Sequence, residues 1–158
     1  MKPATLAQIK KELKQRSPDD IEALCLRLAR FKKENKELLT YLLFEADDEE
    51  GYRQHIIESI DALFDGIANN HSYYLKKSVR KILREVKKCA RYSGNKETEV
   101  LLLIYFCDKL ISYSPTVIRN TTLYNIYDRQ RDYIYKKIET LHEDLQYDYK
   151  LELEELPK

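Results

Sequence analysis

Residues 100–111 read VLLLIYFCDKLI, and this stretch decides the fold that the sequence predicts. Apolar residues occupy almost every side of a helix drawn through it, so such a helix has to be enclosed by other helices. The unbroken apolar part, Val100 to Cys107, is eight residues long, whereas a membrane-spanning helix needs about 20. The stretch therefore predicts the central helix of a soluble helical protein.

The rest of the chain contains few residues that break helices. It has three glycines and four prolines in 158 residues, whereas an all-β domain needs many turns, which favour these residue types. A chain of this length buries about two-thirds of its unfolded surface. We therefore predict an all-α fold, with one domain over residues 1–150 and a frayed acidic tail over 151–158.

The number of helices follows from the start and stop signals. Short links between periodic segments predict six or seven antiparallel helices. Both an irregular bundle of helical hairpins and a short α-solenoid-like stack fit these links, and the sequence leaves the choice open. The alternatives differ in whether the helices close around one core or line an open curved surface.

Two start signals lie near the N-terminus. Thr5 and Gln8 match a Thr-x-x-Gln capping box, which predicts a helix over about residues 6–16. Ser17-Pro18-Asp19-Asp20 combines a capping serine, a first-turn proline and two carboxylates at the positive end of the helix dipole. A second helix should begin there and break within residues 32–37, with Asn35 as the expected position.

The later part of the chain yields further expectations. Residues 38–44 predict a short, mostly buried helix, followed by a cap at Asp47 or Asp48. Ser93-Gly94-Asn95 should end one helix and let Asn95 cap the next. A second Ser-Pro signal at Ser114-Pro115 predicts one long last helix that runs to about Leu145.

The N-terminal part of the sequence resembles that of a known family. The carrying segments are Ile9-Lys-Lys-Glu-Leu13, Ser17-Pro-Asp-Asp-Ile21, Cys25-Leu-Arg-Leu28 and Phe31-Lys-Lys-Glu-Asn-Lys-Glu-Leu-Leu39. They are similar to an uncharacterised group of small all-helical bacterial proteins of the Bacteroidetes type, described only as a domain of unknown function. The resemblance covers about residues 5–115. It implies an all-helical fold and a bacterial origin, and it carries no catalytic residues onto this chain.

The sequence predicts neither catalytic residues nor a cofactor or metal. The three cysteines are widely spaced and form no Cys-x-x-Cys, which is typical of a reduced, cytoplasmic protein. The three histidines are isolated from each other and from the cysteines. Glycine is too sparse for a phosphate-binding loop. We therefore expect a protein that is not an enzyme and does not enter a membrane.

A strongly basic segment spans residues 76–91, with a net charge of +7. The residues we expect to bind anions are Lys77, Arg80, Lys81, Arg84, Lys88 and Arg91. Such a helix could lie along phosphates. The preceding segment, residues 45–65, carries a net charge of −7, so the two could instead neutralise each other along a helical hairpin.

Tyrosine is unusually abundant, with 13 residues. Tyr124, Tyr127, Arg131 and Tyr135 lie close together on the predicted last helix. Tyrosine and arginine are enriched at binding hot spots, although tyrosines at the edge of a core also point a hydroxyl at water. The four residues are our candidate partner-binding patch.

These observations favour a non-enzymatic helical scaffold that binds another protein or a second copy of itself. The alternative is a module that binds nucleic acid or another polyanion through the basic segment. The two interpretations differ in the surface that they require.

Overall fold

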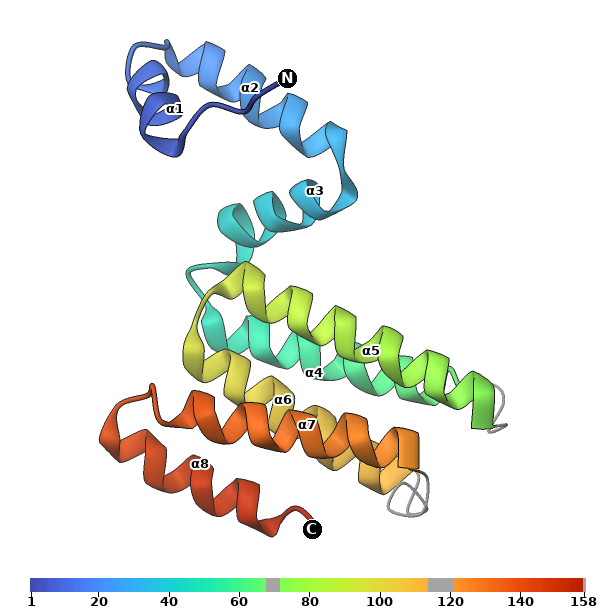
Figure 1. Ribbon diagram of the computed structural model, residues 1–158. Helices are drawn as coiled ribbons and strands as arrows, with labels where there is room; N and C mark the ends of the chain where they lie inside the picture. Colours follow the sequence, from blue (N-terminus) through green and yellow to red (C-terminus); the bar gives the residue numbers. More distant parts are fainter. Residues whose placement is uncertain (68–71, 114–120, 158) are drawn as a thin grey trace. The chain divides into compact units, whose positions relative to one another are not determined.

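The computed structural model describes residues 1–67, 72–113 and 121–157 (Figure 1). All regular secondary structure within these ranges is helical, which confirms the predicted all-α class. Eight α-helices and one π-helical segment are present there, where six or seven helices were expected. The chain divides into two compact units, Met1–Phe44 and Glu45–Lys158, where we expected one domain. Each unit is described by itself.

Helices α1 (Leu6–Leu13) and α2 (Pro18–Phe31) begin as the sequence predicts. The Thr5 backbone N–H donates to Oε1 of Gln8 at 2.9 Å, and the Gln8 N–H donates back to Oγ1 of Thr5. Ser17 and Asp20 form the same reciprocal pair of bonds. Both capping boxes therefore satisfy backbone donors that the first helical turn leaves free.

The break between α2 and α3 (Lys33–Thr40) lies at Lys32, not at Asn35. Lys32 has extended backbone angles, φ −143° and ψ 145°, which end one helix and start the next. Asn35 has a different role, because its Nδ2 donates to the backbone carbonyl of Leu28 at 2.8 Å. It thereby satisfies a carbonyl in the last turn of α2.

The N-terminal unit has almost no core. Helices α1, α2 and α3 contain no buried residue, and Tyr41, in the π-helical segment η1 (Tyr41–Glu45), is buried. The expectation that residues 38–44 are mostly buried is therefore wrong: the side chain of Phe44 is 78% exposed. Within the unit α2 packs mainly on α3, and this pairing leaves the apolar side chains of residues 42–44 exposed.

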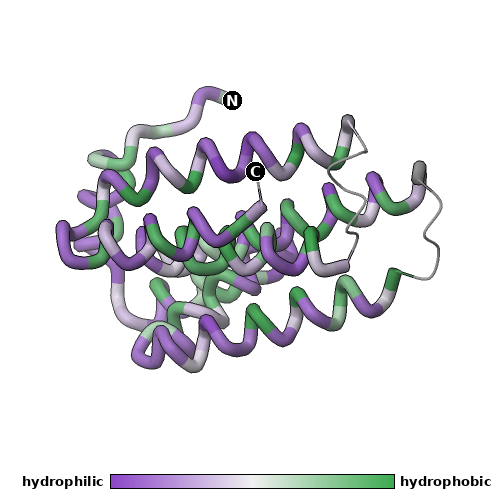
Figure 2. Tube along the Cα trace, turned by 90° about the horizontal axis from the view of Figure 1, so that it is seen from below, coloured by the Kyte–Doolittle hydropathy of each residue, from purple (hydrophilic) through white to green (hydrophobic). Residues whose placement is uncertain are grey.

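The C-terminal unit contains α4 (Glu49–Asp65), α5 (Ser72–Ser93), α6 (Lys96–Tyr113), α7 (Thr121–Ile138) and α8 (Glu143–Glu155). Helix α6 is central, since it packs against α4, α5, α7 and α8. Most of residues 100–111 are buried, as predicted for this stretch. In Figure 2, hydrophobic and hydrophilic residues alternate along the surrounding helices, so each can turn an apolar face toward the core.

Local signals place the ends of these helices. Asp48 caps α4 by accepting the Gly51 N–H at 2.9 Å, which decides between the two expected caps. Gly94 has a φ of +67°, a conformation that favours glycine and ends α5. Oδ1 of Asn95 accepts the Glu97 N–H at 2.9 Å and so caps α6, as expected.

The prediction of a single long last helix is wrong. Helix α7 ends at Ile138, and His142 caps a separate helix, α8. The turn is held by the hydroxyl of Thr140, which donates to the Lys137 carbonyl, and by Gln146, whose Nε2 donates to the Leu141 carbonyl at 2.9 Å. The predicted Ser114-Pro115 start lies outside the described residues.

Helix α8 packs against α6 and α7. It continues to Glu155, where we expected a frayed tail from residue 151, and it buries Tyr149 and Leu153. Leu156, just beyond the helix, is buried as well. These apolar side chains explain why the acidic C-terminal residues are ordered.

A polar network joins the helices of the C-terminal unit beside the core. Nε of Arg53 donates to the hydroxyl of Thr98 at 2.8 Å, and that hydroxyl donates to Glu49. Arg53 also pairs with Glu97 at 3.1 Å. Glu97 accepts the hydroxyl proton of Tyr149 at 2.9 Å. The network thus connects α4, α6 and α8 through groups that are largely withdrawn from water.

We expect Thr98→Val to lower the free energy of unfolding by about 1–3 kcal/mol, because it leaves partners of a fully buried hydroxyl unsatisfied. Urea denaturation followed by circular dichroism measures the change. Thr98→Ser is the matched control, since it keeps the hydroxyl and loses only one methyl group, worth about 0.8 kcal/mol. Equal losses in both variants would show that packing, not the hydroxyl, stabilises this position.

Candidate functional site

The predicted tyrosine patch is only partly at the surface. Tyr127 is buried, and its hydroxyl donates to the Pro157 carbonyl at 2.7 Å. Burial raises its pKa to about 12. Tyr124 and Arg131 are half-buried, and the Arg131 guanidinium lies 5.7 Å from the centre of the Tyr127 ring. Tyr135 is 50% exposed. The structure thus corrects the patch, because Tyr127 is a core residue.

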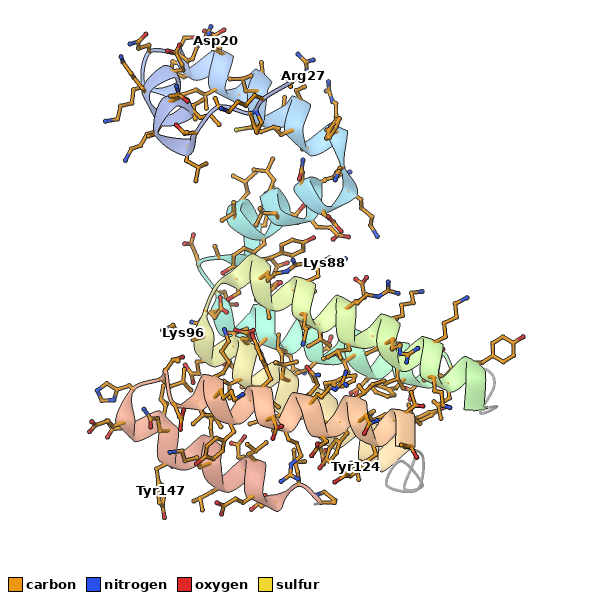
Figure 3. All side chains as sticks on the ribbon, in the orientation of Figure 1. Asp20, Arg27, Lys88, Lys96, Tyr124 and Tyr147 are labelled. Atoms are coloured by element: carbon orange, nitrogen blue, oxygen red, sulfur yellow. The ribbon has the colours of Figure 1, made fainter. Side chains whose placement is uncertain are left out.

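The reason lies in the register of α7. Leu123, Ile134 and Ile138 are buried, and Tyr127 falls on the same helical face as these residues. The neighbouring residue, Ile126, is only half-buried. In Figure 3, Tyr124 lies at the beginning of α7.

The basic residues of α5 do not all lie in one environment. Lys77, Arg80, Lys81, Arg84 and Arg91 are exposed. Lys88 is half-buried and pairs with Glu85 at 2.6 Å on the same helix. Five of the six expected anion-binding residues are therefore available to solvent on α5.

Two acidic residues of α4, Asp61 and Glu50, find partners outside α5. Asp61 pairs with Lys109 of α6 at 2.7 Å and accepts the Tyr105 hydroxyl proton at 2.7 Å. The Lys109 ammonium, together with that hydroxyl, holds the pKa of Asp61 below its usual value. Glu50 pairs with Arg53 on its own helix. These contacts pair Asp61 with a cation of α6 and Glu50 with a cation of α4 itself.

A mixed cluster lies where α5, α6 and α7 meet. The Lys87 ammonium is 4.9 Å from the centre of the Tyr133 ring, and Lys137 approaches the same ring at 5.4 Å. Glu99 pairs with Lys137 at 2.8 Å and accepts the Tyr133 hydroxyl proton. Burial lowers the pKa of Lys87, although the charge of Glu99 opposes the shift. These contacts join α5, α6 and α7.

Two grooves lie in the N-terminal unit. The larger, of 510 Å³, lies between α1 and α2 and is hereafter called the α1–α2 groove. Its apolar lining is Ala4, Ile9, Leu13, Ala23 and Leu24, and its polar lining is Gln8, Glu12, Arg16, Asp20 and Arg27. Asp20 and Arg27 both project from α2 (Figure 3). The smaller groove, of 240 Å³, lies between α2 and α3 and is lined by Cys25, Leu28, Ala29, Asn35, Leu38, Leu39 and Leu42.

A third groove, of 380 Å³, lies between α6 and α8 of the C-terminal unit. It places the carboxylates of Asp108, Glu152 and Glu155 beside Leu101 and Ile104. Burial, with the nearby charges of Glu155 and Asp148, raises the pKa of Glu152. Its surface is acidic and partly apolar.

Cysteine and histidine chemistry gives no candidate site. Cys25, Cys89 and Cys107 form no disulfide with one another, and burial raises the pKa of Cys107 to about 12. Within residues 1–67, 72–113 and 121–157, no group of three or more His, Cys, Asp or Glu side chains is placed to hold a metal ion. None of the helices described is both long enough and apolar enough to cross a membrane.

Comparison with models of known protein families found no match, and neither did comparison with curated proteins or with solved structures. The resemblance to the uncharacterised helical family therefore stays a prediction. The candidate surfaces have to be judged on their own chemistry.

We expect Tyr127→Ala to lower the free energy of unfolding by about 3–5 kcal/mol, as is usual for a large buried aromatic side chain. Tyr135→Ala on the same helix should change it by no more than about 0.5 kcal/mol, because its ring is half exposed. Chemical denaturation of both variants measures the difference. Similar values for the two variants would contradict the assignment of Tyr127 to the core.

Proposed function

We propose that this protein is a non-enzymatic helical scaffold that associates with a second copy of itself through the α1–α2 groove. The observation that supports the proposal is the absence of any buried residue in α1, α2 and α3. Large apolar side chains are exposed on all three helices, among them Leu6, Leu28, Phe31 and Leu38. Exposed apolar surface of this extent commonly marks a protein interaction site.

The length of these helices strengthens the argument. Helices α1 and α3 have eight residues each, whereas isolated helices shorter than about 12–15 residues are marginal in water. Capping contributes to α1 and α2 but buries no apolar surface. A second protein surface over these helices would supply the packing that their apolar faces lack.

The charges at the groove favour a second copy as that surface. Its lining holds two carboxylates, Glu12 and Asp20, and two guanidinium groups, Arg16 and Arg27. In a twofold-symmetric dimer the same patch meets itself, so the patch must be complementary to itself. Equal numbers of opposite charges around an apolar floor meet that requirement, because each acidic group can face a basic group of the other copy.

The site proposed here differs from the tyrosine patch expected from the sequence. Tyr127 is buried, and the ring of Tyr135 lies 5.8 Å from the Lys150 ammonium of α8. The α1–α2 groove, by contrast, combines an apolar floor with a charged rim. It therefore fits a protein partner better than the patch on α7 does.

We expect Leu24→Glu to abolish self-association, because it places a charge on the apolar floor of the groove. Sedimentation velocity over about 1 µM to 1 mM, the weak end of protein association, measures the molecular mass. The wild-type chain should pass from monomer to dimer across this range, and the variant should stay a monomer.

Leu26→Glu is the matched control. Leu26 lies on the same helix and is 43% exposed, against 42% for Leu24, but it does not line the groove. This variant should associate like the wild type. A wild-type chain that stays monomeric at every concentration, or equal losses in the two variants, would overturn the proposal.

A further inference from the structure

The exposed cations of α5 form a line along one side of the helix. The positions 77, 80, 81, 84 and 91 fall within a sector of about 100° when residues are placed 100° apart, as in an α-helix. The buried residues Leu75, Val79, Ile82, Val86 and Ala90 occupy the opposite sector. Packing of the apolar side on the core therefore turns the cations outward. We call Lys77, Arg80, Lys81, Arg84 and Arg91 the cationic stripe.

The stripe is not neutralised by direct contacts in the part of the chain that the structure describes. None of its five side chains forms an ion pair there. The one acidic residue of α5, Glu85, pairs with Lys88. On α4, Asp61 is engaged with α6 and Glu50 with Arg53. Among the described residues, no ion pair therefore joins the cationic stripe to the acidic side chains of α4.

The shape of the stripe selects among anionic partners. From Lys77 to Arg91 it extends about 21 Å at 1.5 Å per residue, a length over which duplex DNA presents about twelve phosphates. A helix that inserts into a membrane surface needs an exposed apolar face in addition to its cations. The apolar face of α5 is buried in the core, so the stripe suits a linear phosphate polymer.

An aromatic side chain stands at one end of the stripe. Tyr74 is 55% exposed and lies about one turn before Lys77 and two turns before Lys81, on the same side of the helix. Exposed aromatic rings beside basic grooves stack on unpaired bases. This neighbour favours nucleic acid over an acidic protein segment.

We propose that the cationic stripe of α5 binds the phosphate backbone of nucleic acid without reading its sequence. Lysine and arginine contacts to phosphate position a protein on the polymer and carry no base information. The site lies on the C-terminal unit and shares no residue with the α1–α2 groove. A substitution in the groove therefore leaves the side chains of the stripe unchanged.

The test is fluorescence anisotropy with a labelled single-stranded oligonucleotide and with its duplex, over a series of salt concentrations. If all five cations contact phosphates, the logarithm of the affinity should fall with the logarithm of salt concentration, with a slope of about −3.5 for the single strand and about −4.5 for the duplex. Binding of either the single strand or the duplex supports the proposal, and the one that binds more tightly is the preferred ligand.

The stripe variant is Arg80→Gln, Lys81→Gln and Arg84→Gln combined. Two cations remain, so the slopes should fall to about −1.4 and −1.8, and the affinity at low salt should drop more than tenfold. The three side chains are exposed, so an unchanged circular dichroism melting curve should accompany the loss.

The control removes the same charge elsewhere. Lys10→Gln, Lys11→Gln and Lys14→Gln together neutralise three exposed lysines of the N-terminal unit, none of which lines the α1–α2 groove. This variant should keep the wild-type affinity and slope. Leu24→Glu should keep them too, which separates failure of self-association from failure of this site.

Three results would overturn the proposal. The first is no anisotropy change with either oligonucleotide at low salt. The second is an equal loss of oligonucleotide affinity in the stripe variant and in the control variant, which would indicate attraction by net charge alone. The third is equal or tighter binding to a polyglutamate peptide or to phosphatidylserine vesicles, which would assign the stripe to an acidic protein or a membrane.

Discussion

The C-terminal unit depends on one constraint, the need to keep α6 away from water. Residues of this helix are buried on nearly all sides, and no single neighbouring helix can cover such a surface. Helices α4, α5, α7 and α8 each contact it. The amphipathic character of these four helices follows from the same requirement, since each supplies one apolar face and keeps its charges outside. The outward position of the α5 cations is thus a by-product of how α6 is enclosed.

The sequence predicted those features that residues near in the chain determine. The capping box at Thr5, the capping serine at Ser17, the glycine stop at Gly94 and the enclosed stretch 100–111 all rest on local chemistry or on an unmistakable pattern. The division of the last helix was missed, because the turn depends on hydrogen bonds made by Thr140 and Gln146, residue types that helices also accept.

The candidate sites show a second limit of prediction from the sequence. A hydrophobic pattern shows which side of a helix is apolar, but not what covers it. The apolar face of one amphipathic helix, α5, is buried, and that of another, α2, is exposed. The tyrosine patch failed at Tyr127 because one step of register decides between the core and the surface. The opposite charges of residues 45–65 and 76–91 suggested mutual neutralisation, yet Asp61 pairs with Lys109 of α6. The partner of a charged side chain depends on the packing angle between helices. The pattern of residues along one helix does not give this angle.

The cysteines have a consequence for how the opening of the C-terminal unit can be observed. Cys107 is fully buried on α6, with a pKa raised to about 12, and the thiolate is the form that reacts. Its modification by a thiol reagent therefore has to await an excursion in which the helices around α6 separate. Cys25 and Cys89 are only half-buried. The rate at which Cys107 is modified therefore measures how often the core of the C-terminal unit opens.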